Sequence, residues 1–373
     1  MGALDGILVI AIEQAVAAPM CTVRLADAGA RVIKIERPEG ETARHYDYAV
    51  EGSCTYFTWL NRGKESAVLD LKTDTDMALM RRMLGQADVL VQNLAPGAMD
   101  RLGLGNAMLQ RDYPQLIVVS ICGYGADTDY AGMKAYDLLV QAESGICAIT
   151  GTEQEPCKVG APVADVATGT NAHAAVLEAL IARGRTGTGQ CIEVAMFDGL
   201  ADWLAVPFLH QEHAHTTTQR HGMSHATVYP YRPYQCEDGT LLLAVQNNQQ
   251  WARFCTKALE RPDLTARTDF ATNADRVRHR TALDAELVPW FASQMVADAI
   301  AKLETAGIAW ARYRDVSGLA EHPALRRTRV TLENGAEVEI PRPAGRDDTF
   351  RPGPLPALGA DTKKIRAEFG SMS

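Results

Sequence analysis

The amino-acid sequence predicts an α/β protein in which a large domain with a parallel β-sheet is joined to a smaller α+β domain. Short aliphatic runs alternate with helical stretches through the first 200 residues, which is typical of a parallel sheet covered by helices on both faces. After about residue 205 the pattern changes to a polar segment, a hairpin and several helices. The chain has 373 residues, 47% of them hydrophobic, which is enough for two separate cores.

The large domain begins with runs of strand length that lack the alternation of a half-exposed strand. Uninterrupted aliphatic and β-branched residues predict buried strands, and such runs occur at 6–12, 30–36, 87–93 and 115–121. Segments with helical spacing lie between them, including TVRLADAG and TDMALMRRMLGQ.

A longer helix and one more strand follow. Apolar residues recur at helical spacing between Ala172 and Arg183, and the glycine-rich GRTGTG that comes next predicts the end of that helix. The run QCIEVAMF then predicts a strand. We therefore expect residues 1–200 to form the first part of the large domain.

The remaining sequence predicts a small domain inserted into the large one. Residues 201–225 are polar and rich in His and Thr, which indicates a linker. Within 226–320, YPYRPYQC and TLLLAV flank an Asp-Gly pair and predict a β-hairpin, and three amphipathic helical stretches follow. A second linker is expected at 321–345, and the tail 346–373 is expected to return to the large domain.

Composition and charge narrow the classes of partner. The formal net charge of −9 argues against nucleic acid, because that binding depends on Lys and Arg neutralising phosphates. No apolar run reaches the ~18 residues that span a bilayer, and MGALDGILVIAI lacks the basic region of a signal peptide. The eight cysteines are scattered without a C-x-x-C pair, which is typical of reduced thiols in a cytoplasmic protein.

Three kinds of site have weak support in the sequence. Gly103 and Gly105 approach a dinucleotide fingerprint, but a third glycine is missing and the pair follows a helical stretch rather than a strand. Five histidines crowd residues 210–225 without reinforcing ligand spacing, so we expect no metal. The G-x-S-x-G pattern of a serine hydrolase does not occur.

Asp165, in VGAPVADVATG, lies between an apolar loop and a predicted helix, and two interpretations fit it. Aspartate is favoured at a helix N-cap, where its side chain accepts hydrogen bonds from the first helical N–H groups. A carboxylate at a helix N-terminus can also act as a nucleophile, because the helix dipole stabilises negative charge there. The residue pattern alone leaves both interpretations open.

An ordered series of segments resembles one family over almost the whole chain. The series comprises LDGILVI, AAPMCTVRLADAGARVIKIERPEGETAR, YFTWLNRGKESAVLDLK, VLVQNLAPGAMDRLGLG, QLIVVSICGYG, AYDLLVQAESG, GAPVADVATG, RTGTGQCIEV and LGADTKKI. It resembles the class III CoA-transferases, the formyl-CoA and carnitine CoA-transferase (CaiB/BaiF) group.

The resemblance implies a Rossmann-like large domain, a small domain and a homodimer of two interlocked chains. It also implies that Asp165 is the catalytic nucleophile and that coenzyme A is a substrate, with no permanently bound cofactor. Arg and Lys side chains suit the phosphates of CoA. The positions that match the family's CoA groove are Val16, Arg37, Leu69, Asn93, Arg101 and Lys134.

The mechanism implied by the resemblance passes through covalent intermediates. The Asp165 carboxylate attacks the donor thioester, and the resulting anhydride is converted by the released thiolate into an enzyme-bound CoA thioester. Oxyanion stabilisation is expected from backbone N–H groups near Gly123 and from small-domain loops. Two departures from the family stand out: the glycine-rich loop of formyl-CoA transferase has no counterpart, and Asp127-Thr128-Asp129 stands where GP usually follows GYG.

The segments TARHYDY and YFTWLNRGKESAVLDLK resemble the branch that acts on C4–C5 dicarboxylates such as itaconate, mesaconate and citramalate, with succinyl-CoA or a similar donor. Arg44 is the candidate cation for a second substrate carboxylate, and Tyr136 is a candidate substrate contact. Intramolecular transfer between two carboxyls of one acid fits the same residues.

Two other functions are disfavoured. An α-methylacyl-CoA racemase needs a His and Asp pair for proton transfer, and Tyr136 occupies the position of that His. A non-catalytic CoA-binding protein is disfavoured because Asp165 is retained.

Overall fold

A computed structural model of the chain describes residues 2–370, and it divides into two compact units. The large unit comprises the residues up to Ile146, Val159–Val206 and those from Arg326 onward. The small unit comprises Cys147–Lys158 and Pro207–Leu325. Residues 147–158, which we expected in the large domain, therefore belong to the small unit.

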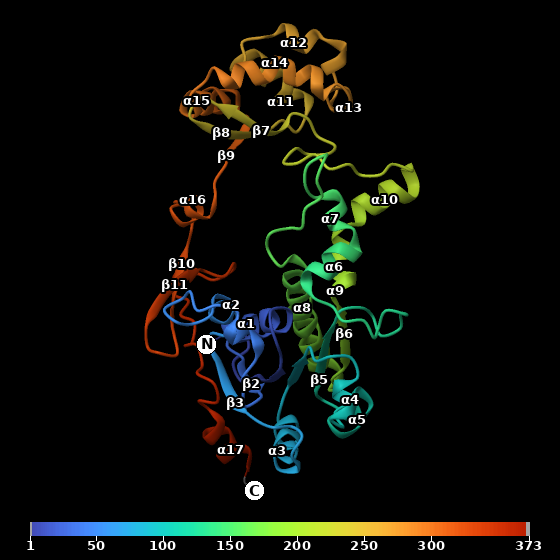
Figure 1. Ribbon diagram of the computed structural model, residues 1–373, viewed down its shortest axis with the longest axis vertical. Helices are drawn as coiled ribbons and strands as arrows, with labels where there is room; N and C mark the ends of the chain where they lie inside the picture. The colour runs from blue at the N-terminus through green and yellow to red at the C-terminus, as the bar shows by residue number, and fades with distance from the viewer. Residues whose placement is uncertain (1, 371–373) are drawn as a thin grey trace. The chain divides into compact units, whose positions relative to one another are not determined.

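A six-stranded parallel sheet forms the centre of the large unit, with the order β3-β2-β1-β4-β5-β6 (Figure 1). This confirms the prediction of an α/β fold with a parallel sheet. The order is that of dinucleotide-binding domains, in which ligands bind at the carboxyl ends of the strands where the strand order reverses. The strands are β1 (Leu8–Ile12), β2 (Arg31–Glu36), β3 (Lys64–Val68), β4 (Val89–Gln92), β5 (Ile117–Cys122) and β6 (Cys191–Ala195).

Helices cover both faces of this sheet. On one face, α1 (Ala17–Asp27) and α8 (Val163–Thr186) pack against each other and against aliphatic side chains of the central strands (Figure 1). On the other face, a second core joins the sheet to four further helices, so the final helix completes the large unit. These are α3 (Asp74–Leu84), α4 (Ala98–Arg101), α5 (Asn106–Asp112) and α17 (Thr362–Gly370).

The small unit has its own core, formed by a three-stranded antiparallel sheet and the helices packed on it. The predicted hairpin is confirmed as β7 (Tyr231–Cys236) and β8 (Gly239–Ala244), and β9 (Ala309–Arg312) pairs with β8. The predicted helices are also confirmed; the first continues into a π-helical segment. The helices are α11 (Asn248–Arg253), η2 (Phe254–Ala258), α12 (Asp263–Ala266), η3 (Thr268–Phe270), α13 (Asn273–Arg278), α14 (Arg280–Ala292) and α15 (Val296–Ala306).

The two expected linkers contain regular structure. Residues 201–225 include α10 (Ala205–Ala214), and residues 321–345 include the hairpin of β10 (Arg327–Thr331) and β11 (Glu337–Pro341). Exposed residues alternate with buried or half-buried ones in that hairpin, so one of its faces lies toward solvent. The remaining elements are η1 (Thr42–His45), α2 (Thr55–Leu60), α6 (Asp137–Ser144), α7 (Ile146–Ile149), α9 (Met196–Trp203) and α16 (Val316–Ala320). Across residues 2–370, every helix is too short or too polar to cross a membrane.

Candidate active site

Asp165 is the third residue of α8, in its first turn, and it does not cap that helix. The N-cap position is Pro162, and the cap is supplied from another element. Oδ1 of Asp137, the first residue of α6, accepts hydrogen bonds from the N–H groups of Ala164 at 2.8 Å and Asp165 at 3.4 Å. The N-cap interpretation of Asp165 is therefore wrong, and its carboxylate is left available for other contacts.

Asp137 is held in place by a buried glutamine. Nε2 of Gln141 donates to Oδ2 of Asp137 at 2.7 Å, and Oε1 of Gln141 accepts the N–H of Val159 at 2.9 Å. Because both carboxylate oxygens of Asp137 accept hydrogen bonds, the side chain is held in position beside the start of α8.

A second helix N-terminus reaches Asp165. The backbone N–H of Ala17, the first residue of α1, lies near the Asp165 carboxylate and stabilises its negative charge. The approach of the two helices depends on Gly169, where a Cβ would stand only 2.4 Å from the carbonyl oxygen of Ala17. Asp165 therefore lies where the N-termini of α1 and α8 meet, a location that favours negative charge.

The surroundings nevertheless keep this carboxyl group a weak acid. Burial and, to a lesser extent, the negative charge of Asp137 raise the pKa of Asp165 to about 7, against the opposing effect of the Ala17 N–H. A perturbed acid at the carboxyl edge of a sheet of this kind is a candidate functional residue.

The stability of the protein should depend on this pKa. Between the ordinary value of 3.8 and about 7, the folded protein keeps a proton that the unfolded chain has released, so the free energy of unfolding falls as pH rises and levels off above 7. Asp165→Asn removes the effect. The test is urea denaturation from pH 4.5 to 8.5. Over this range the free energy of unfolding of Asp165→Asn, relative to that of the wild type, should rise by about 2 kcal/mol or more, since one pKa unit corresponds to ~1.4 kcal/mol.

The matched control is Asp129→Asn, because Asp129 is an exposed loop residue. Its difference from the wild type should stay flat with pH. An equally flat difference for Asp165→Asn would contradict the raised pKa.

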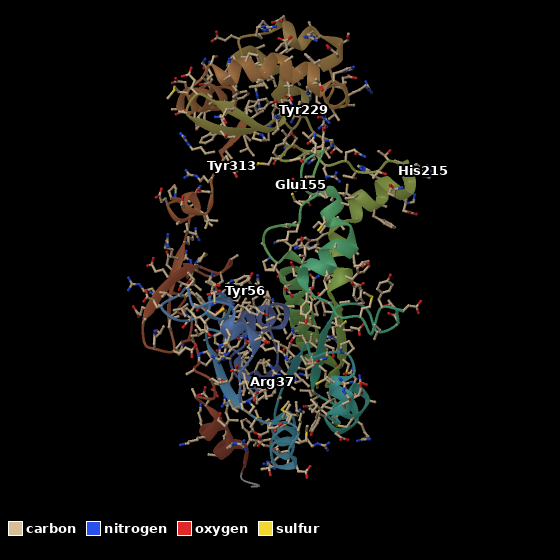
Figure 2. All side chains as sticks on the ribbon, in the orientation of Figure 1. Arg37, Tyr56, Glu155, His215, Tyr229 and Tyr313 are labelled. Carbon is tan, nitrogen blue, oxygen red and sulfur yellow. The ribbon has the colours of Figure 1, made fainter. Side chains whose placement is uncertain are left out.

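A cavity of about 380 Å³ opens at the carboxyl ends of β1 to β4. Its wall includes Glu13 and Gln14 from the β1–α1 loop, so this one loop reaches both the cavity and, through Ala17, Asp165. Arg37 and Lys72 contribute the cationic side chains, and neither forms an ion pair with any of residues 2–370. Arg37 can be found in Figure 2.

The predicted groove residues take up different positions. Arg37 and Leu69 line the cavity. Val16 is buried in a small apolar cluster at the start of α1, whereas Arg101 and Lys134 are exposed outside the cavity wall. Lys72, which lines the cavity, was missed because a single exposed Lys in LDLK carries no distinguishing local pattern.

Asn93 fixes the β1–α1 loop. Its Oδ1 accepts the N–H of Gln14 at 2.8 Å, and its Nδ2 donates to the carbonyl oxygen of Gln14 at 2.9 Å. Since both ends of the amide are engaged, Asn93 shapes the loop rather than presenting a free polar group to the cavity.

The contacts of Arg44 argue against the prediction that it binds a substrate carboxylate. Its Nε and Nη2 donate to the two carboxylate oxygens of Glu36 at 2.8 and 2.7 Å, and the guanidinium lies 3.8 Å from the centre of the Phe57 ring. Arg44 is buried, and it also donates to the carbonyl oxygen of Pro356. A guanidinium that already forms a bidentate pair has no free fork for another carboxylate.

Two tyrosines lie near Asp165. Burial raises the pKa of Tyr46, and the negative charges of Glu41 and Asp165 and the nearby Tyr136 add to that effect. Tyr136 is exposed, and Tyr46 packs edge-on against Tyr56. The sequence predicted Tyr136 but not Tyr46 or the N–H of Ala17, although the Pro in AAPM is typical of a helix start.

Comparisons with known proteins decide the family. The family model for CoA-transferase family III matches residues 4–362. The chain belongs to this family.

Characterised relatives align with the transferase over most of its length. An acetyl-CoA:oxalate CoA-transferase of Acetobacter aceti is 34% identical over 377 residues, covering 99% of this chain and 96% of the relative. A succinyl-CoA:mesaconate CoA-transferase of Haloarcula hispanica is 36% identical over 303 residues, covering 79% of this chain and 76% of the relative. The crystal structure of a CaiB/BaiF family protein from Brucella suis matches with a TM-score of 0.84 and 33% identity over 99% of both chains.

These matches confirm the family resemblance and identify the protein as a CoA-transferase. Among residues 2–370, no group of three or more His, Cys, Asp or Glu side chains could hold a metal ion.

Proposed function

We propose that the transferase moves CoA from succinyl-CoA or a similar acyl-CoA to a C4–C5 dicarboxylate such as itaconate, mesaconate or citramalate, through a thioester on Asp165. One observation carries the proposal: the Asp165 carboxylate lies where the N-termini of α1 and α8 meet, and the β1–α1 loop that leads to this point also lines the cavity. A carboxylate is suited to this exchange because its anhydride with an acyl group is activated toward a thiolate.

The chemistry proceeds in four steps that conserve the thioester energy. An oxygen of Asp165 attacks the donor carbonyl, the C–S bond breaks, and an acyl-aspartyl anhydride and the CoA thiolate form. The thiolate attacks the aspartyl carbonyl and releases the donor acid. The acceptor carboxylate then attacks the aspartyl thioester, and the freed thiolate attacks the acceptor acyl carbonyl to regenerate Asp165.

The N–H of Ala17 has a role in each of these steps. In the free enzyme it stabilises the carboxylate. During the reaction the same donor can stabilise the oxyanion that forms on the aspartyl carbonyl, because it is fixed at a helix N-terminus. This proposed donor adds to the backbone N–H groups expected near Gly123, which also lies in the large unit, and in the small-domain loops.

CoA would lie along the carboxyl edge of the sheet. Arg37 and Lys72 are placed to pair with its phosphates at the cavity. Val16, Leu69 and Asn93 would shape the wall, and Arg101 and Lys134 would contact more exposed parts of the ligand.

The acceptor acid would lie against the tyrosines near Asp165. Because Arg44 is already paired, the second carboxylate of the acceptor is proposed to accept hydrogen bonds from the Tyr46 and Tyr136 hydroxyl groups. The name of the Haloarcula relative supports a dicarboxylate of this size, whereas that of the Acetobacter relative raises oxalate as the competing acceptor.

A panel of acceptors tests the assignment. The purified protein is incubated with succinyl-CoA and one acid at a time, and each new acyl-CoA is quantified by mass spectrometry. Itaconate, mesaconate or citramalate should give the highest kcat/KM, with oxalate and monocarboxylates lower. A clear preference for oxalate or for a monocarboxylate would overturn the assignment, and CoA moving within mesaconyl-CoA alone would establish intramolecular transfer.

We also propose that the transferase is a cytoplasmic homodimer, as the family resemblance implies. No disulfide forms among residues 2–370, which suits a reducing compartment. Helix α10 exposes Val206, Phe208 and Leu209, apolar side chains that a second chain could cover. Light scattering on the purified protein gives the mass that checks this state.

A further inference from the structure

A buried ionic cluster lies beside the β1–α1 loop. Glu13, Lys34, Glu41 and Lys64 are each at most 5% exposed. Nζ of Lys34 lies 2.6 Å from Oε1 of Glu41 and 3.2 Å from Oε1 of Glu13, and Nζ of Lys64 lies 2.6 Å from that same oxygen of Glu13. The two cations and two anions balance, which is the condition under which buried charges are tolerated.

Glu41 connects this cluster to the loop. While its Oε1 pairs with Lys34, its Oε2 accepts the N–H of Ala15 at 2.7 Å. Ala15 has a φ of 60°, in the left-handed region that residues with a Cβ rarely occupy. Such a conformation persists only where the surroundings hold it, and Glu41 is the side chain that bonds this residue.

We propose that Glu41 is a positioning residue for catalysis: it holds Ala15 in its left-handed conformation, so that Ala17, two residues further on, presents its N–H to Asp165. The inference rests on the proposed nucleophilic role of Asp165. Glu41 acts through the backbone of the loop, so its effect is on how Asp165 is solvated and hydrogen-bonded.

The direction in which the pKa of Asp165 changes when Glu41 is replaced separates this positioning role from a direct effect of the Glu41 charge. The groups that face Asp165 are Asp137 from α6, the N–H of Ala17 and, near by, Tyr46. Removing a negative charge at Glu41 would by itself lower the pKa of Asp165. Losing the stabilising N–H of Ala17 would raise it, so an upward shift identifies the positioning role.

The experiment measures the pKa of Asp165 without using catalysis. Unfolding free energies of a parent protein and its Asp165→Asn derivative are compared from pH 4.5 to 9.5, and the pH at which their difference levels off reports the folded-state pKa. The parents are wild type, Glu41→Ala, Glu41→Gln and Glu41→Ala/Lys34→Met. The double variant removes both partners of the ion pair, so it should fold even where Glu41→Ala leaves a buried Lys34 charge too costly.

In Glu41→Ala, or in the double variant, the pH at which the stability difference levels off should rise by about one unit, as expected for losing a hydrogen bond to a charged group. Glu41→Gln keeps an oxygen acceptor for Ala15 but removes the negative charge, so it should leave the pH unchanged or slightly lower while the protein loses stability. The control is Asp27→Asn, which breaks the buried Asp27–Arg62 pair at the opposite end of α1 and should not move the pH.

Two results would overturn the inference: an unchanged pH in both Glu41→Ala and the double variant, or a downward shift in these two variants. An upward shift in Glu41→Gln as large as in Glu41→Ala would also contradict a role through the acceptor oxygen. Failure of the proposed function can be distinguished from these results. The proposed function requires CoA transfer by the wild type, whereas the unfolding measurements need no turnover.

Discussion

Replacing Asp165 with Asn is expected to lower kcat for CoA transfer by on the order of 10⁴- to 10⁶-fold, the range typical for losing a catalytic nucleophile. Asn has nearly the same shape, so the contact with Ala17 and the packing of α1 on α8 are retained while the attacking oxygen loses its charge. Transfer from succinyl-CoA to the best acceptor is followed by steady-state kinetics.

The variant should remain folded, because at neutral pH it is expected to be more stable than the wild type. Asp129→Asn is the activity control, since Asp129 is exposed, and it should keep wild-type kinetics. Near-normal turnover by Asp165→Asn would contradict covalent catalysis at this residue.

Gly169→Ala is expected to reduce both stability and transfer. The added Cβ would stand 2.4 Å from the carbonyl oxygen of Ala17 and 2.6 Å from Cβ of Met20, so α1 must move away from α8. We expect the free energy of unfolding to fall by about 1–3 kcal/mol, as for overpacked cores. Displacing the donor at Ala17 by a few tenths of an ångström to 1 Å should lower kcat by up to about 10²-fold.

Gly184→Ala is the matched control on the same helix. Nothing lies within 4 Å of the Cβ that it would add, so the higher helix propensity of Ala should stabilise the protein by up to ~1 kcal/mol without changing kcat. Thermal unfolding and steady-state kinetics compare the two variants. If Gly169→Ala behaves as Gly184→Ala does, the close contact between α1 and α8 does not position the site.

The sequence predicted most of the fold because most buried strands are continuous aliphatic runs. The strand β3 (Lys64–Val68) was missed, since Lys64 and Ser66 are buried there. Those polar side chains are tolerated because Lys64 pairs with Glu13 and Ser66 donates to Glu36. A strand whose burial depends on partners distant in the sequence has no local apolar signature.

The candidate site was predictable only in part, for a related reason. Asp165 and Tyr136 were found from the family resemblance, and both lie in the same neighbourhood. The capping of α8 by Asp137 and the pairing of Arg44 with Glu36 are tertiary contacts. The first shows that Asp165 is not a cap, and the second leaves Arg44 without a free guanidinium edge, and neither contact is visible in the local sequence pattern.

The most direct test of the central claim is to trap the enzyme-bound thioester. The transferase is incubated with succinyl-CoA without an acceptor, treated with hydroxylamine, digested with trypsin and mapped by tandem mass spectrometry. The tryptic peptide 159–183 contains Asp165, with Glu178 as its one other acidic residue. We expect a hydroxamate on Asp165 that is absent from Asp165→Asn. A hydroxamate on a different residue, or none in a preparation that transfers CoA, would contradict it.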